Sequence, residues 1–132
     1  MEKVKVLTAK LGFDIHSRGV TVVNRLLRDT GMEVIYLGNQ YPETIVAAAL
    51  DEDVDIIAIG SLSSTGLDYA QKLMTLLKEK NASDIPVVFG GIVAPDELHR
   101  LKEIGLVSYF PPGSDLDEMA KTFIDLAAQK QK

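Results

Sequence analysis

The chain contains no cysteine and no tryptophan, and its 132 residues include no long apolar run. Without cysteine the protein can build neither a disulfide bond nor a zinc–thiolate site, and thiol catalysis is excluded. No segment approaches the roughly 18 consecutive apolar residues that a membrane-spanning helix requires. The first ten residues, MEKVKVLTAK, also lack the apolar core of a signal peptide. We therefore expect a cytoplasmic protein that makes no contact with a membrane.

Positive charge is scarce as well. The chain has 14 Lys and Arg residues against 19 Asp and Glu residues, which gives a formal net charge of −5. Because binding to nucleic acid requires a basic face for the phosphates, this balance argues against a nucleic-acid partner. Hydrophobic residues make up 46% of the chain, and its length suits one domain, which we expect to span residues 1–132.

What the sequence does contain is a regular alternation of short apolar runs and helical patterns. The runs predict strands at residues 4–9, 33–38, 54–60, 85–90 and 107–110. Helical spacing of apolar residues predicts helices at 19–30, from Pro42 to about Asp53, around 67–77, from Pro95 to a stop at Gly105, and after a cap at Ser114.

This order of elements predicts an α/β fold. Strands that alternate with helices form a parallel sheet with helices on both faces. Five strands suit the doubly wound, flavodoxin-like (Rossmann-like) arrangement with strand order 2-1-3-4-5. In such sheets ligands bind beyond the carboxyl ends of the strands, near the switch point between the first and third strands.

The loops expected at that edge carry most of the glycines of the chain. They are KLGFDIHSRG at 10–19, GSLSSTG at 60–66, GGIVAP at 90–95 and PPGS at 111–114. Since glycine lets a ligand approach the backbone closely, this clustering predicts a binding site at one edge of the sheet.

The first of these loops has the chemistry of a metal ligand. Asp14 stands two residues before His16, and a carboxylate that accepts one imidazole N–H makes the other ring nitrogen a better ligand. A site built from protein groups alone needs three or four ligands. The only other histidine, His99, falls in a helix and is expected to face solvent. One histidine suffices when a macrocycle supplies the remaining ligands, as in haem or a corrinoid.

Three motifs together resemble a known family. KLGFDIHSRG resembles the D-x-H-x-x-G signature of cobalamin-binding domains, and DEDVDIIAIGSLS and IPVVFGGIVAPDEL resemble later segments of the same domains. The relatives are the cobalamin-binding domains of methylmalonyl-CoA mutase and related acyl-CoA mutases that use adenosylcobalamin. The resemblance extends over almost the whole chain.

The resemblance implies a role for each motif. It implies that His16 binds the cobalt of the cofactor, that Asp14 braces His16, and that Lys10 supports Asp14. It also implies that the nucleotide tail of the cofactor inserts between the sheet and the helices, and that no residue of this chain is itself catalytic. The cofactor-binding residues expected on this basis, besides Asp14 and His16, are Ser17, Arg18, Gly19, Gly60, Ser61, Leu62, Ser63, Gly90, Gly91, Pro112 and Gly113.

Two positions depart from the family pattern. The third-strand loop is usually S-x-L in the family, and aligning Leu62 with its leucine puts Gly60 where the serine belongs. We expect Ser61 or Ser63 to supply the missing hydrogen bond to the tail base. Ser17 stands where acyl-CoA mutases often have aspartate, which leaves Asp14 and His16 unaffected.

The resemblance implies the small subunit of a radical mutase, an isomerase that rearranges an acyl-CoA carbon skeleton with adenosylcobalamin. The chain is too short to hold the substrate barrel of its relatives, so we expect a separate large subunit to carry the barrel and no activity from this chain alone. The acyl group and the subunit stoichiometry are left open.

Other functions remain as alternatives. A corrinoid carrier in methyl transfer shares the histidine loop, but it usually has a helical domain ahead of the first strand, and here that strand is expected at about residue 4. A non-catalytic cobalamin chaperone is the other corrinoid alternative. A receiver module needs an aspartate ending the third strand, and a flavodoxin needs a Ser/Thr-rich loop after the first. Neither is present in this sequence.

Overall fold

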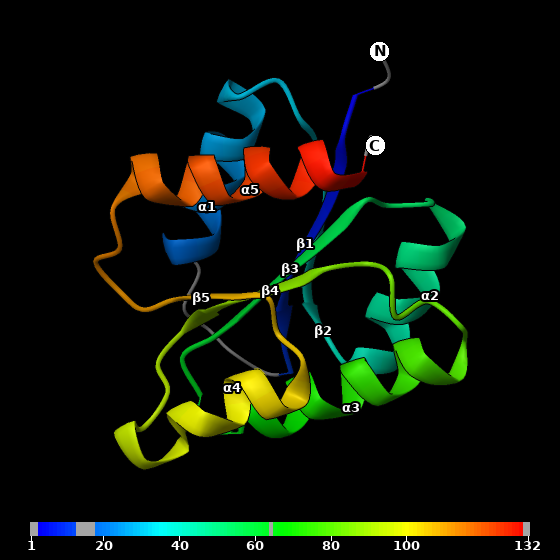
Figure 1. The fold of residues 1–132 in the computed structure, drawn as a ribbon, viewed down its shortest axis with the longest axis vertical. Coiled ribbons are helices and arrows are strands. Elements are labelled where there is room, and N and C mark those ends of the chain that lie inside the picture. The colour runs from blue at the N-terminus through cyan, green and yellow to red at the C-terminus, as the bar shows by residue number, and fades with distance from the viewer. Residues whose placement is uncertain (1–2, 13–17, 64, 131–132) are drawn as a thin grey trace.

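The fold is a single parallel sheet between two layers of helices (Figure 1). The computed structural model describes residues 3–12, 18–63 and 65–130. Its five strands have the order β2-β1-β3-β4-β5, and every neighbouring pair is parallel. The flavodoxin-like architecture and the strand order predicted from the sequence are therefore confirmed.

The predicted elements are all present, with small shifts at their ends. The strands are β1 (Lys5–Leu11), β2 (Glu33–Gln40), β3 (Ile56–Ser61), β4 (Val87–Gly91) and β5 (Ser108–Phe110). The helices are α1 (Arg18–Asp29), α2 (Pro42–Asp51), α3 (Gly66–Glu79), α4 (Leu98–Ile104), which follows a 3₁₀ turn at Pro95–Glu97, and α5 (Leu116–Lys130). None of these helices, within the described ranges, is long and apolar enough to cross a bilayer.

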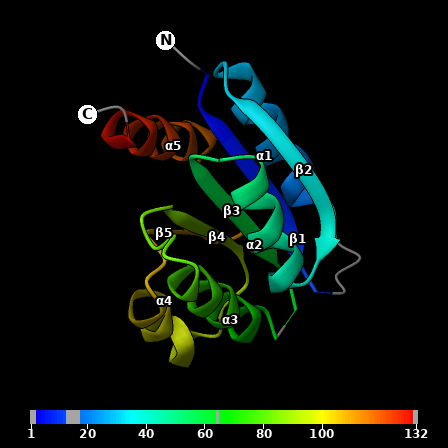
Figure 2. The ribbon, with the colours of Figure 1, turned by 90° about the vertical axis from the view of Figure 1, so that its right-hand side faces the viewer.

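The two faces of the sheet carry separate cores. Helices α1 and α5 cover one face, while α2, α3 and α4 lie on the other (Figures 1 and 2). Successive strand residues point to opposite faces. Thus Leu7 and Ile57 pack in the larger core under α2 and α3, whereas their neighbours Val6 and Ile56 pack in the smaller core under α1 and α5. Since both faces are buried, the strands have apolar runs without alternation.

Glycines end two of the helices, as the sequence predicts. Gly31 has φ of +88° and follows α1, and Gly105 has φ of +102° at the end of α4. Both lie in the left-handed region that favours glycine at a helix end.

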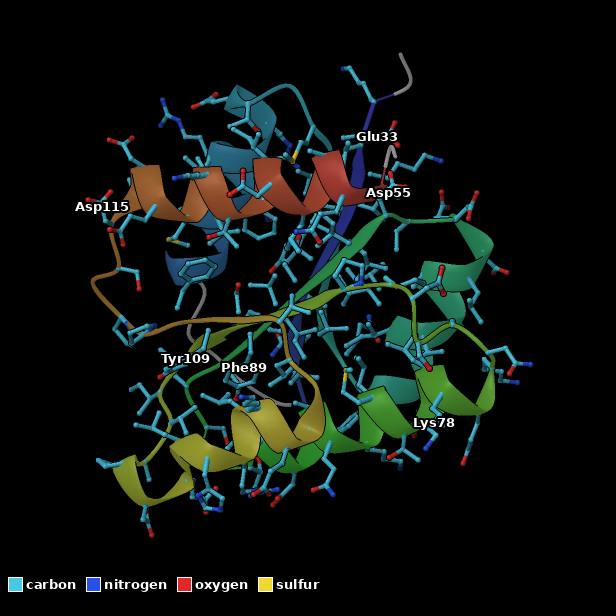
Figure 3. All side chains as sticks on the ribbon, in the orientation of Figure 1. Glu33, Asp55, Lys78, Phe89, Tyr109 and Asp115 are labelled. Carbon is cyan, nitrogen blue, oxygen red and sulfur yellow. The ribbon has the colours of Figure 1, made fainter. Side chains whose placement is uncertain are left out.

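The start of α5 differs from the prediction. The hydroxyl of Ser114 donates to the carbonyl of Pro111 and does not cap the helix. The carboxylate of Asp115 accepts the backbone N–H groups of Asp117 and Glu118, at 2.8 and 3.4 Å. Figure 3 shows Asp115 where α5 begins. The negative charge of Asp115 also suits the positive end of the helix dipole, so the cap lies one residue later than predicted.

Replacing this cap is expected to destabilise the protein. Asp115→Ala removes the acceptor for two N–H groups and should lower the free energy of unfolding by about 1 kcal/mol. Urea unfolding followed by circular dichroism measures the loss. The matched control is Ser114→Ala, which should cost less. Equal losses for the two variants would show that Asp115 does not cap α5.

Candidate functional site

A cleft of about 680 Å³ opens between the sheet and the pair α1 and α5. It lies at the carboxyl ends of β1, β3, β4 and β5, which is the edge that the sequence indicates. One wall comes from Val22 and Val23 on α1, and another from Met119 and Phe123 on α5. The segment Pro111–Ser114 closes one end. This volume falls in the range of small-molecule and cofactor sites.

The cleft exists because small residues stand at the carboxyl ends of β3 and β4 on this face. Ala58, Gly60 and Gly90 form its floor, and Gly60 pairs with Gly90 in the register of β3 and β4. A Cβ added to Gly60 would meet no atom closer than the Gly90 carbonyl oxygen at 3.5 Å. One added to Gly90 would meet none closer than the Phe110 carbonyl oxygen at 3.6 Å. The room above both glycines is therefore open.

The opposite face at the same level is filled. Ile57, Ile59 and Phe89 alternate with the small residues along the same two strands and are all buried in the core under α3. Helix α3 consequently packs directly on the sheet, whereas α1 and α5 leave a trough. The difference between the two faces comes from the alternation of large and small residues in β3 and β4.

Few polar side chains reach the cleft from the described residues. Thr8 lies on its wall, but its hydroxyl donates to Oδ1 of the buried Asn24 at 2.6 Å. Lys10, the next-to-last residue of β1, also lines the cleft and has only 4% of its surface exposed. Ser114 donates its hydroxyl to the Pro111 carbonyl oxygen at 2.5 Å. The cleft is thus mainly an apolar slot with a cation at one side.

Ser61 and Ser63 direct their hydroxyls elsewhere. The Oγ of Ser61 accepts the backbone N–H of Ser63 at 3.0 Å. A Cβ added to Gly66 on α3 would lie 2.7 Å from the Ser61 Cβ, so this side chain points to the α3 face. The Ser63 hydroxyl is 2.9 Å from that of Thr65. These contacts oppose the expectation that either serine replaces the hydroxyl missing at Gly60.

Gly91 is required by the close approach of two strands. Its φ is +133°, and an added Cβ would lie 1.8 Å from the Ser61 carbonyl oxygen. No other residue fits there without moving the backbone. The hydroxyl of Tyr109 donates to the Gly91 carbonyl oxygen at 2.7 Å, and the Tyr109 ring packs 6.1 Å from that of Phe89 (Figure 3). Tyr109 thereby fixes the β4 end of the cleft.

The structure brings most of the predicted cofactor-binding residues together around the cleft. Seven of them line the cleft, as does Lys10: Gly60, Ser61, Leu62, Gly90, Gly91, Pro112 and Gly113. Ser63 is not among the lining residues. Arg18 and Gly19 form the start of α1. Asp14, His16 and Ser17 lie outside the described residues. His99 is exposed on α4, as expected.

Several contributors to the site were not predicted. The expected cofactor-binding residues do not include four residues of the predicted helices that line the cleft: Val22 and Val23 on α1, and Met119 and Phe123 on α5. Tyr109 was assigned only to a short strand. The sequence did hold one signal for these wall residues, which is the small size of Ala58, Gly60 and Gly90 at alternate strand positions. Small residues there leave the helix side chains above them without close contacts on the sheet, so a cleft between them could have been predicted.

A flavodoxin-like sheet with a deep cleft at its carboxyl edge defines a class of small-molecule-binding α/β domains. Within that class, the family model of the B12 binding domain matches residues 4–119. The chain therefore belongs to the B12-binding domain family, as its motifs indicate.

Relatives within the family are close. The chain is 39% identical to the 2-hydroxyisobutanoyl-CoA mutase small subunit of Aquincola tertiaricarbonis over 88% of this chain and 89% of that one. It is also 39% identical to the pivalyl-CoA mutase small subunit of Xanthobacter autotrophicus, over 89% of this chain and 80% of that one. A cobalamin-binding protein from Desulfitobacterium hafniense superposes with a TM-score of 0.83 over 95% of this chain and 60% of that one, at 18% identity, which shows a shared fold.

The ionisation of Tyr109 is expected to make the free energy of unfolding depend on pH. Burial raises the pKa of the Tyr109 phenol above its usual value near 10. Its neutral form is favoured in the folded state, so the stabilisation is complete below pH ~10 and is lost as the pH rises through the folded-state pKa.

Tyr109→Phe should therefore reduce the free energy of unfolding by about 1 kcal/mol at pH 8, because the Gly91 carbonyl loses its donor. The difference from the parent should shrink at alkaline pH. Urea unfolding at both pH values measures this. Tyr36→Phe, at an exposed position on β2, serves as the control. A Tyr109→Phe penalty that is absent at pH 8 would contradict the assigned hydrogen bond.

Proposed function

We propose that this chain is the cobalamin-binding small subunit of an adenosylcobalamin-dependent acyl-CoA mutase. One observation carries the proposal. A cleft with a bare floor opens at the end of β1, where the chain continues into the D-x-H-x-x-G loop. A ligand that filled the cleft with its tail could therefore have its remaining part beside the end of β1, the strand that precedes this motif in the sequence. A corrinoid with a nucleotide tail has that form.

The residues present fit such a cofactor. Missing side chains at Gly60 and Gly90 leave room for a flat ring, and Pro112 and Gly113 close the end of the cleft. Among the described residues, Lys10 is the cationic residue that lines the cleft. His16 would bind cobalt, and Asp14 would hold the imidazole in the correct tautomer. Bound adenosylcobalamin supplies a carbon radical by breaking its cobalt–carbon bond.

In this proposal the chain binds and orients and does not itself transfer groups. The apolar walls from α1 and α5 keep water from the tail, and the rigid sheet fixes its depth. Each contact between the tail and the cleft would raise the affinity of the chain for the cofactor and so favour the bond between the His16 imidazole and cobalt. The radical and the substrate would meet on the open side, beyond the strand ends.

That open side offers a surface for a partner. Four large apolar residues on the rim of the cleft are exposed: Val22, Leu62, Ile92 and Leu116. Exposed apolar side chains that gather around a site mark a surface for binding. We propose that a large mutase subunit, which brings the acyl-CoA substrate, covers this rim. Both curated relatives described above are themselves named small subunits of acyl-CoA mutases.

Removal of the cobalt ligand is expected to abolish the spectrum of histidine-bound cobalamin. On titration with adenosylcobalamin, the parent chain should shift the cofactor to the form with the benzimidazole displaced and imidazole bound. His16→Ala should not produce this form. His99→Ala is the matched control, because His99 is exposed on α4 and should leave the spectrum unchanged. If His16→Ala gave the same histidine-bound spectrum as the parent chain, His16 would not be the cobalt ligand and the proposal would lose its basis.

A corrinoid carrier in methyl transfer and a cobalamin chaperone are the alternatives, and activity separates them from a mutase. The isolated chain with adenosylcobalamin should isomerise no acyl-CoA. Isomerisation should appear when a large mutase subunit without its own cobalamin domain is added, and it should saturate as the chain is titrated. Chromatography of the acyl-CoA products measures this. Methyl transfer from a methylated corrinoid on the isolated chain, with no isomerisation in the mixture, would favour the carrier.

A further inference from the structure

The floor of the cleft determines how a tail base can be recognised. Gly60 and Gly90 have no side chains and Ala58 has only a methyl group, so these three positions offer a flat apolar surface. The backbone of the floor is engaged in strand pairing, since Gly60 lies in register with Lys10 on one side and Gly90 on the other. Nothing on the floor itself is left to match a polar ring atom.

The nearest hydroxyls are also committed. Thr8 donates its proton to Asn24, Ser114 donates to Pro111, and Ser61 faces α3. The closing segment contains Pro111 and Pro112, which have no backbone N–H to donate. Within the described part of the chain, Lys10 and Thr8 are the polar residues of β1 that line the cleft.

We propose that the Ala58, Gly60 and Gly90 floor recognises the aromatic base of a cobamide tail by shape and apolar contact, and that the chain therefore prefers bases with few polar ring atoms. The proposal rests on the proposed function and adds a selectivity to it. Adenine carries ring nitrogens and an amino group that would lose water without gaining partners, which costs binding free energy. A p-cresol base carries no polar ring atom, and benzimidazole carries one free nitrogen.

The test uses corrinoids that differ only in the tail. The 132-residue chain is titrated calorimetrically with p-cresolyl cobamide, 5,6-dimethylbenzimidazolyl cobamide (cobalamin, called the benzimidazolyl form below), adeninyl cobamide and cobinamide, which has no nucleotide tail. We expect adeninyl cobamide to bind about tenfold more weakly than p-cresolyl cobamide. Cobinamide should bind more weakly than p-cresolyl cobamide, because it leaves the cleft unfilled.

Two substitutions at Gly60 separate hydrogen bonding from shape. Gly60→Ser adds a hydroxyl to the floor, and Gly60→Ala adds only the methyl group. The nearest atom lies 3.5 Å from the added Cβ, so both should fold, which thermal unfolding checks. For each corrinoid, the affinity of the variant is divided by the affinity of the parent chain. The free energy needed to displace the base from cobalt is the same in both measurements, so it does not affect this ratio.

Gly60→Ser should strengthen binding of the benzimidazolyl form relative to the p-cresolyl form by about threefold to tenfold. Gly60→Ala should change both in the same proportion. Equal affinities of the parent for adeninyl and p-cresolyl cobamides, or equal ratios in the two variants, would overturn the proposed selectivity. Binding of none of the four corrinoids would instead overturn the proposed function, and the selectivity with it.

Discussion

The whole site depends on the small size of three residues near the carboxyl ends of two adjacent strands, on one face of the sheet. Gly60 and Gly90 place no side chain beneath α1 and α5 and Ala58 only a methyl group, and a cleft of about 680 Å³ remains there. A packed interior normally leaves no void of this size, because lost dispersion contacts and unburied apolar area destabilise the fold. On the other face, the larger core under α2 and α3 is filled by large apolar side chains.

The same two strands impose a second constraint. At their carboxyl ends the backbones approach so closely that Gly91 admits no Cβ, and Tyr109 holds the Gly91 carbonyl from the α4 side. The two neighbouring glycines therefore have different roles. Gly90 leaves space for a ligand, whereas Gly91 lets the strands meet. A family motif containing a pair of glycines does not distinguish these roles, because the distinction depends on which face each residue takes.

The departure from the family pattern at Gly60 also acquires a physical meaning in the structure. Ser61 and Ser63 are the candidates in the sequence for replacing the serine hydroxyl that Gly60 lacks. The Ser61 side chain points to the opposite face, however, and the Ser63 hydroxyl forms a hydrogen bond with that of Thr65. A hydroxyl one residue away along a strand cannot take the place of one on the floor, because consecutive residues alternate between faces. The floor is consequently apolar, which is the basis for a selectivity among tail bases.

Local patterns in the sequence were sufficient to predict the five strands, the glycine ends of α1 and α4, and the edge that carries the site, because these depend on periodicity and on residues close in the chain. The strand order was inferred from the number of strands and the chain length, and the structure confirms it. The cap of α5 was wrong by one residue, since Ser114 and Asp115 both suit that role and only the turn at Pro111 decides between them. The walls formed by Met119 and Phe123, the Tyr109 contact with Gly91 and the orientation of Ser61 were decided by tertiary structure. Each depends on residues far apart in the chain that meet only when both helix layers pack on the sheet.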